Sequence, residues 1–451
     1  MKLNWFSPLP PAKTGIADYV SGILPELSER AELTLWTDQA RWDPSIEKYA
    51  EVHTFRVEQM PWVELNLADL NIYNLGNNHL FHGSIWQVAR RQPGAVILHD
   101  HRLHEFFDSL YRRHWQDPDG YLAHMETHYG EAGRNEAAES VRNGSTAIHS
   151  LAERYPLTGL ALENSLAVLV HTQEAYEELK PAKRWLLAYS PLPFSAKLQC
   201  PGARTRTKEI RTNSQPYRLI VFGFINRNRR LDVLLEALAQ LPQKDKFHLD
   251  IYGEVWDPGY LRTTIKSLGL NRQVTLHGFV PESDLELALS AADLAVNLRY
   301  PTMGEASISQ LRIWAHALPT LVTHIGWYAG LPENVVAHVR MEHEGADIKK
   351  HLNAFLASPN GFAEMGERGR RMLEAEHSVE CYVEAVLDLA VQAQAFRPRA
   401  VAYQLAERVG IAVSPWADAL ASDEELHKAA EEIFVLTNGD GQAREIAAKV
   451  D

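Results

Sequence analysis

The chain has 451 residues, which favours two domains over one. Hydrophobic residues make up 45% of it and charged residues 23%, as in ordinary globular proteins. The formal net charge of -13 argues against nucleic acid as a main partner, although a local basic pocket could still bind a small anion.

The N-terminal stretch 1–15 lacks the apolar core of a signal peptide. No apolar run approaches the ~20 residues that cross a bilayer. The two cysteines, Cys200 and Cys381, lie far apart without a metal-ligand spacing, so reduced thiols are expected. We therefore expect a cytoplasmic protein and leave open a peripheral contact with the inner face of the membrane. The sequence does not predict an oligomeric state.

In the first half of the chain, short apolar runs alternate with helical stretches. Strands are expected at 1–8, 31–37, 70–76, 95–100 and 166–172, with an amphipathic helix at 15–29. Apolar runs that end in polar residues are typical of buried parallel strands joined by crossover helices. We therefore predict a Rossmann-like domain at 1–190 with a helical insertion at about 108–162.

A second series of the same kind follows a stretch rich in Pro, Ser and Thr at 191–216, which we interpret as a linker or exposed loop. Strands are expected at 217–223, 247–253, 273–278, 294–298 and 319–323. Helices are expected between them. The predicted fold class is α/β, with two Rossmann-like doubly wound domains facing across a cleft. The second domain is placed at 217–377, followed by a crossover helix at 378–396 and a helical tail at 397–451.

Two strand exits in the first domain carry candidate site residues. Gly15 lies at a helix start, where backbone N–H groups attract anions, although an ordinary strand–helix turn explains it equally. His99 and Asp100 directly follow a strand. We expect His99 to bind a substrate hydroxyl and Asp100 to hold its tautomer. The alternative is a buried histidine satisfied by its neighbours. No second ligand cluster accompanies these residues and His101, so no metal site is predicted.

The loop after the 70–76 strand is rich in side chains that suit sugar hydroxyls. Asn77, Asn78 and His82 lie there, and we place them with His101 on the side of the cleft that would bind an acceptor. Turn formation alone explains the Asn-Asn pair equally well.

The second domain has cations at the corresponding position. Gly223 ends the 217–223 strand, and Arg227 and Arg229 follow it. Guanidinium groups at a strand exit suit a diphosphate, which they bind bidentately. Arg229 is the preferred ligand and Arg227 the second. Arg230 could instead pair with an acid on the following helix.

Two further loops complete the candidate site. Gly278, Phe279 and Val280 follow a strand, where a backbone N–H and C=O can contact a base edge. After the 294–298 strand, the helix start at Ser307–Ser309 offers free N–H groups to a phosphate. Glu305 precedes it and suits sugar hydroxyls. Alternatively, Glu305 only favours the positive end of the helix.

These motifs, taken in order, resemble the retaining glycosyltransferases of family four, which have the GT-B fold. The resemblance covers roughly residues 1–335 and rests on PPAKTGIADYV, HD after AVIL, VHTQEAYEEL, VFGFINRNRRLDVLLEAL, HGFVPESDLELALSAADLAVNL and GEAS…ALPTLV. The segments YNLGNNHLFHGSIW and RYPTMGEASISQLRIWAHALPTLV resemble a bacterial subset that accompanies polysaccharide synthesis.

The resemblance implies roles for individual residues. Glu305 would bind hydroxyls of the donor sugar, and Ala306, Ser307, Ile308 and Ser309 would offer backbone N–H groups to its diphosphate. Gly15 corresponds to the glycine loop near the diphosphate, and His99 to the histidine near the transferred sugar. Arg229 takes the place of a family lysine. No cofactor beyond the nucleotide-sugar donor is implied.

The sequence departs from the family at three positions. The second glutamate of the family, which binds the ribose, falls at Ile313 or, with a shorter loop, at Arg312. A family arginine is replaced by Phe224, and a glycine by Ile308. Arg312 therefore stays in the expected donor site without the acid that would accept ribose hydroxyl protons.

The implied function is transfer of a sugar, with retention, from a nucleotide-diphosphate sugar to a glycan, a lipid-linked acceptor or another hydroxyl. The departures leave two alternatives open. One is an impaired nucleotide-sugar-binding or scaffolding protein of the same fold. The other is a nucleotide-sugar epimerase or hydrolase of the same architecture.

Overall fold

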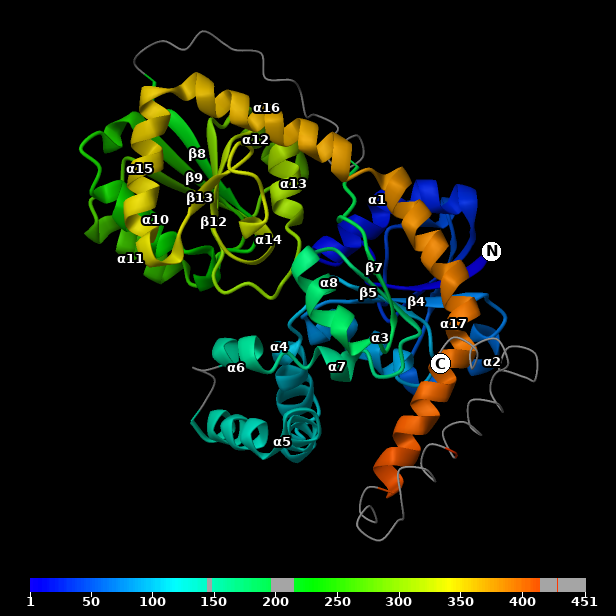
Figure 1. Ribbon diagram of the computed structural model, residues 1–451. Helices are drawn as coiled ribbons and strands as arrows, with labels where there is room; N and C mark the ends of the chain where they lie inside the picture. Colours follow the sequence, from blue (N-terminus) through cyan, green and yellow to red (C-terminus); the bar gives the residue numbers. More distant parts are fainter. Residues whose placement is uncertain (144–147, 196–214, 414–427, 429–451) are drawn as a thin grey trace, which may run out of the picture.

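The computed structural model describes residues 1–143, 148–195, 215–413 and 428. Two parallel β-sheets form the centres of two domains (Figure 1). The first sheet contains β1 (Lys2–Phe6), β2 (Glu32–Thr37), β3 (Glu51–Thr54), β4 (Leu70–Leu75), β5 (Ala95–Leu98), β6 (Ala167–Val170) and β7 (Leu186–Tyr189). The second contains β8 (Tyr217–Phe222), β9 (Phe247–Tyr252), β10 (Val274–Gly278), β11 (Leu294–Asn297), β12 (Thr320–Thr323) and β13 (Ala337–Val339).

The strand order places a topological switch in each sheet. The first sheet runs β3-β2-β1-β4-β5-β6-β7 and the second β10-β9-β8-β11-β12-β13. In such doubly wound sheets, ligands bind beyond the carboxyl ends of the strands where the order reverses. The switch lies between β1 and β4 in the first domain and between β8 and β11 in the second. The predicted fold class is confirmed.

Helices cover both faces of the first sheet, which explains its continuous apolar strands. Because side chains alternate along β1, Trp5 packs into the core beneath α1 (Gly15–Arg30), and Phe6 into the opposite core beneath α3 (His79–Ala89). Short helices α2 (Trp62–Leu65) and α8 (Gln173–Leu179) complete this domain.

Between β5 and β6 the chain forms the helices of the predicted insertion. They are α4 (His104–Asp108), a π-helical turn at Ser109–His114, α5 (Pro118–Asn143), α6 (Ile148–Arg154) and α7 (Thr158–Ala161). Helices α5 and α6 extend away from the sheet (Figure 1). A change of direction within α5 occurs at Gly130, whose φ of 69° leaves the helical region.

The second sheet is covered in the same way. Its helices are α10 (Leu231–Ala239), α11 (Pro258–Ser267), α12 (Glu282–Ala291), α13 (Ile308–Ala315), α14 (Gly326–Ala329), α15 (Glu344–Ala357) and α16 (Pro359–Glu376). Leu234 and Ile348 fill the core under α10 and α15. Leu289 and Ile313 fill the core on the other face, under α12 and α13.

The last described helix returns to the first domain. α17 (Val379–Val413) packs against α1, β6 and β7 (Figure 1). The Tyr382 hydroxyl lies 2.5 Å from that of Tyr19. The helix continues past 396, so the boundary expected there between a crossover helix and a tail is wrong. The reason is that residues after 396, including the buried Ala400 and Ala402, stay helical. Residues 414–427 and 429–451 of the expected tail, and 196–214 of the expected linker, lie outside the described residues.

Among the described residues, no helix combines the length and the apolar character needed to cross a bilayer.

Candidate functional site

The loops at the two switch points meet between the domains. Gly15, the first residue of α1, faces the start of α13 so closely that a Cβ on it would lie 3.1 Å from Cγ2 of Ile308. Nearby, the Lys13 ammonium lies 4.8 Å from the ring centre of Phe279. The predicted residues of the β1 exit and of the second domain therefore lie against each other where the domains meet.

The loop that carries Glu305 is bound to the first domain through its backbone. The Arg102 N–H donates to the Met303 carbonyl at 2.8 Å, and the Thr172 hydroxyl donates to the Gly304 carbonyl at 3.4 Å. Gly304 has a φ of +77°, and a Cβ there would lie 2.7 Å from Cβ of His101. Only glycine fits this conformation and this approach without strain.

Glu305 is fixed by donors of its own loop. Its Oε2 accepts hydrogen bonds from the Thr302 hydroxyl and the Met303 N–H, both at 2.7 Å. Its Oε1 lies 3.3 Å from Nη1 of Arg299. A carboxylate with three such partners is held in one orientation, at the entrance to α13.

Arg299 is a site residue that the sequence analysis missed. Burial disfavours its charge, but Glu305 and Tyr328 outweigh burial and raise the pKa of Arg299. Its N–H donates to the Thr323 hydroxyl at 3.0 Å. A signal was present, because Arg299 follows the predicted 294–298 strand and so lies at the ligand-binding edge.

The start of α13 has the geometry expected for anion binding. Ser307 caps the helix by accepting from the Gln310 N–H at 3.2 Å, and its side chain is buried. Among the described residues, none accepts a hydrogen bond from the backbone N–H groups of Ala306, Ser307, Ile308 and Ser309. These donors remain for a ligand.

Arg229 is buried at the same place. Its Nη1 donates to Asn297 Oδ1 at 2.9 Å, and Asn297 in turn donates to Gln310 in the first turn of α13 at 3.1 Å. Burial, reinforced by the nearby Arg299, lowers the pKa of Arg229 to about 9, so it is still charged at neutral pH. No ion pair joins Arg229 to another described residue.

Gly223 makes room for this guanidinium. Its φ is +103°, and a Cβ on it would lie 2.9 Å from Nη2 of Arg229. A side chain at position 223 would therefore collide with the Arg229 guanidinium, which explains why glycine is required there.

The other two arginines of this loop point elsewhere. Arg227 is exposed, and its guanidinium lies 5.9 Å from the ring centre of Trp256, away from Arg229. Arg230 forms a bidentate ion pair with Glu344 on α15. The alternative that Arg230 pairs with an acid of α10 is not what the structure shows, because its partner is Glu344.

His99 and Asp100 do not act on one another, which corrects the predicted tautomer-holding pair. Successive residues point to opposite sides of an extended chain, so the two side chains diverge. His99 Nε2 lies 3.0 Å from Asn74 Oδ1. Burial, with the nearby His171, lowers the pKa of His99 well below its usual range, so its ring is neutral.

Asp100 instead faces the second domain. Its Oδ2 accepts from the Asn77 N–H at 2.7 Å. Burial and the Glu305 carboxylate across the cleft raise the pKa of Asp100 to about 7, against a partial opposing effect of Arg299. The structure thus brings together two carboxyl groups from different domains.

The four predicted acceptor-side residues have structural partners. Asn78 caps α3 by accepting from the Leu80 N–H at 3.0 Å, and the Asn77 side chain accepts from the Phe106 N–H at 3.0 Å. The buried His82 ring bonds the Asn74 carbonyl at 2.9 Å, and burial lowers its pKa to about 4. His101 is buried against Glu178 at 2.5 Å. These contacts leave His82 and His101 little surface for a substrate, which the sequence could not show.

Arg312 belongs to an ion-pair network rather than to an open donor site. Its Nη2 pairs with Glu282, and its Nε lies 3.4 Å from Glu286 Oε1. Glu286 also pairs with His316 at 2.9 Å. Because Ile313 is buried beside this network, the helix face that would carry the second glutamate is occupied.

The β10 exit contributes an exposed ring. The Gly278 carbonyl accepts from the Gly253 N–H at 2.7 Å, so it is already used within the domain. Phe279 is 71% exposed and forms part of the cleft wall with Lys13. Val280 is half-buried beside it.

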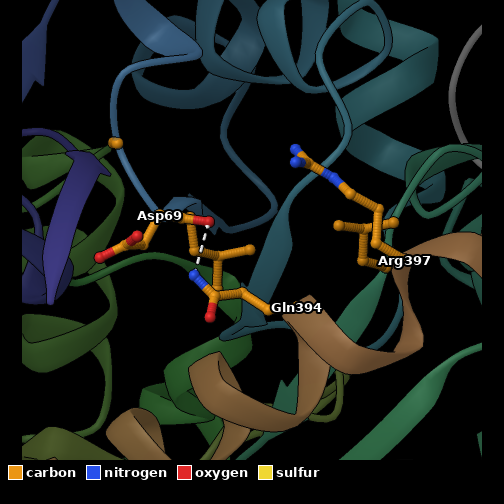
Figure 2. Close-up of a pocket in the computed structure, with 6 residues that line it drawn as sticks. Asp69, Gln394 and Arg397 are labelled. Atoms are coloured by element: carbon orange, nitrogen blue, oxygen red, sulfur yellow. Dashed lines mark hydrogen bonds between the residues drawn. The ribbon is translucent and has the colours of Figure 1, made fainter.

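No group of three or more His, Cys, Asp or Glu side chains among the described residues could hold a metal ion. A separate cavity of about 280 Å³ lies at the opposite edge of the first sheet (Figure 2). It is lined by Asp69, Gln394 and Arg397 among others, and Gln394 donates to the Asp69 carbonyl at 3.2 Å. Because this is the amino edge of β4 and β6, it is not part of the site described above.

Two Rossmann-like domains that meet at the switch points of their sheets define a GT-B fold. Solved structures agree with it. HepE of Anabaena, in complex with UDP, matches with a TM-score of 0.58 and 15% identity over 86% of this chain and 99% of its own. Sucrose-phosphate synthase of Thermosynechococcus elongatus matches with a TM-score of 0.58 and 16% identity over 88% of this chain and 99% of its own.

Sequence comparison assigns the second domain. Residues 204–372, which include most of the second domain, match the family model of glycosyl transferases group 1. Mannosylfructose-phosphate synthase of Agrobacterium fabrum is 30% identical over 115 residues, which are 23% of this chain and 25% of that protein. The match thus spans about a quarter of that relative's length. The resemblance to group 1 glycosyltransferases is confirmed, and the retaining subset stays a prediction.

Proposed function

We propose that the protein is a glycosyltransferase, which moves a hexosyl group with retention from a nucleotide-diphosphate sugar to a hydroxyl of a glycan or lipid-linked acceptor. One observation carries the proposal. Arg229, buried and without an ion-pair partner among the described residues, is linked through Asn297 to the first turn of α13, and Glu305 lies at the entrance to that helix. A diphosphate has the charge and size for this position.

Each group has a role in the proposed reaction. Arg229 and the N–H groups at 306–309 would stabilise the negative charge that develops on the leaving diphosphate. Glu305, already oriented by Thr302 and Met303, would hold hydroxyls of the transferred sugar. HepE of Anabaena, which shares this fold, has been solved in complex with UDP-glucose, and this supports a uridine nucleotide as the first donor to test.

The donor site is tested by thermal melting with a panel of nucleoside diphosphates and their sugars. A ligand at 100 times its dissociation constant stabilises the folded protein by about 2.7 kcal/mol. A rise in melting temperature is expected for at least one nucleotide. If every nucleotide leaves the melting temperature unchanged, there is no donor site.

Glu305→Gln separates binding from turnover. The amide keeps the shape but loses the charge that orients sugar hydroxyls, so we expect transfer to fall about 100-fold or more while nucleotide affinity changes little. Glu236→Gln, at an exposed position on α10, is the matched control. Unchanged transfer in Glu305→Gln would exclude the proposed role of this carboxylate.

A binding protein without transfer activity is the second candidate. The Arg312 network and the buried Ile313 favour it, because they occupy the helix face where a ribose-binding acid was expected. Nucleotide binding together with no transfer to any acceptor would support it. Conversion of the nucleotide sugar in the absence of an acceptor would instead indicate an epimerase or hydrolase. The stereochemistry of the product would then distinguish these two.

A further inference from the structure

Exposed aromatic side chains lie on the exit loops of the second sheet. Phe224 follows β8, Trp256 follows β9 and Phe279 follows β10, and water reaches more than half of each side chain. Single exposed rings are common on protein surfaces, so the surroundings of each ring decide whether it marks a contact site.

Trp256 has surroundings that make such a site. It lies on the rim of a small cavity of about 50 Å³ between the β8 exit loop and α11, and Tyr260 of α11 lies on the same rim. The two rings are 64% and 52% exposed. A ligand in the solvent can therefore reach both side chains.

The backbone beneath Trp256 is already ordered. The Ile225 N–H donates to the Glu254 carbonyl, and the Trp256 N–H donates to the Ile225 carbonyl, both at 2.9 Å. These bonds extend the pairing of β8 and β9 beyond the strand ends. A ligand would therefore meet a preformed surface and would not have to order a loop.

Polar groups surround the two rings. Arg227 lies over Trp256, and its guanidinium forms no hydrogen bond or ion pair with another described residue. The Asp232 carboxylate, which lines the same cavity, forms no hydrogen bond with another described residue. Asp257 uses Oδ1 to cap α11 through the Tyr260 N–H at 2.9 Å. The rim thus carries hydrogen-bond donors and acceptors beside apolar faces.

We propose that this surface is a saccharide-binding subsite, in which Trp256 and Tyr260 pack against the face of a pyranose ring. A pyranose has apolar C–H faces and a perimeter of hydroxyls that both donate and accept hydrogen bonds. It therefore matches aromatic faces flanked by a guanidinium and carboxylates. Two carboxylates beside one arginine disfavour a phosphate or an anionic lipid headgroup.

The subsite is separate from the donor site. Arg229 points back to Gly223 and Asn297, whereas Arg227, two residues before it, points out to Trp256. A glycan held here would be anchored on the second domain beside the reaction centre. The choice of a saccharide as ligand rests on the proposed glycosyl transfer, but binding at Trp256 needs neither donor nor turnover.

The test measures binding of neutral oligosaccharides to the full chain without nucleotide. The probes are gluco-, manno-, galacto- and N-acetylglucosamine hexasaccharides. Their binding is measured by calorimetry and by saturation-transfer NMR of their ring protons. We expect at least one to bind in the millimolar range or tighter. Trp256→Ala should weaken it about tenfold or more, and Trp256→Phe should retain most of the affinity.

Tyr189→Ala, an exposed aromatic of the first domain, is the matched control and should bind like the unchanged protein. The proposal is overturned if no probe binds, if Trp256→Ala binds as well as the unchanged protein, or if inorganic phosphate displaces the saccharide. Saccharide binding that depends on Trp256 in a protein without transfer activity would leave the subsite standing and remove the proposed function. Glycosyl transfer by a protein that binds no saccharide at Trp256 would support the proposed function and exclude the subsite.

Discussion

His99 and Asp100 are neighbours in the chain but lie in different electrostatic surroundings. His99 is enclosed by Asn74 and by the rings of Tyr19 and His171, with ring centres 4.9 and 5.0 Å away, and stays neutral. Burial and the facing Glu305 carboxylate of the other domain raise the pKa of Asp100 to about 7. Asp100 therefore changes charge in the physiological range, whereas His99 does not.

The titration of Asp100 predicts how stability depends on pH. An unfolded aspartate has a pKa of about 3.9, so between about pH 4 and pH 7 the folded protein holds a proton that the unfolded chain releases. Folding stability must therefore fall as pH rises through this window. Denaturant unfolding at several pH values, compared with Asp100→Asn, measures the effect. As pH rises from about 4 to 7, the free energy of unfolding of the unchanged protein should fall relative to that of Asp100→Asn. A difference that does not change with pH would contradict the raised pKa of Asp100.

Gly223→Ala tests the steric origin of the Arg229 position. Alanine at a φ of +103° is strained, and its Cβ would press on the guanidinium at 2.9 Å. We expect a loss of about 1–3 kcal/mol in the free energy of unfolding together with weaker nucleotide binding. Gly269→Ala, at a φ of +65° with no atom within 4 Å of the new Cβ, carries the backbone strain alone. Equal nucleotide affinity in both variants would show that Gly223 does not act through Arg229.

The sequence predicted which loops form the site better than it predicted the contacts within them. Strand exits can be found from apolar runs, and the structure places Gly223, Arg229 and Glu305 on the loops that follow β8 and β11. Asp100 and Glu305 interact across two domains, and nothing local in the chain encodes the angle between the domains. The ion pairs of Arg312 with Glu282 and Glu286 on α12 were not predicted either, because they join residues of two different helices.

At the scale of elements, the strands that the sequence missed are β3, β7 and β13. All three lie at the edge of a sheet. An edge strand has a neighbour on one side only, so it can be short, as the four residues of β7 and the three of β13 are. The short sequence of β3, Glu51–Thr54, shows no continuous apolar run. The central strands, which place the site, were all predicted.

The loop at Gly304 offers a test of how the domains cooperate. In Gly304→Ala, the new Cβ would lie 2.7 Å from Cβ of His101 and would separate the loop from the first domain. Transfer should fall, while nucleotide affinity should persist because Arg229 and α13 both belong to the second domain. Kinetics and nucleotide titration of the same samples measure the two effects.

His101→Gly in the same chain removes the colliding atom and should restore part of the transfer activity. Gly269→Ala again controls for backbone strain. Equal losses of nucleotide affinity and transfer, or no recovery in the double variant, would show that the contact with His101 does not support the Glu305 loop.

At the scale of the whole molecule, one apolar core continues from the first domain into the second. It joins Tyr19 of α1, Tyr382 of α17, Leu373 of α16 and Trp314 of α13. Domains that share a core lose contacts together when either unfolds. We therefore expect a single heat-capacity peak in calorimetry, with calorimetric and van't Hoff enthalpies that agree. Two separate peaks would show that the domains are energetically independent.

The chain passes between the domains twice, and the two crossings are bonded to each other. The Phe194 N–H donates to the His377 carbonyl at 3.0 Å, and His377 Nδ1 lies 2.6 Å from the Leu192 carbonyl. Two rigid bodies pinned at one point cannot slide apart there, but they can still turn about it. The relative motion that remains is a rotation of one domain about this point. Such a rotation would move the Glu305 loop of the second domain away from Arg102 and Thr172, its partners in the first.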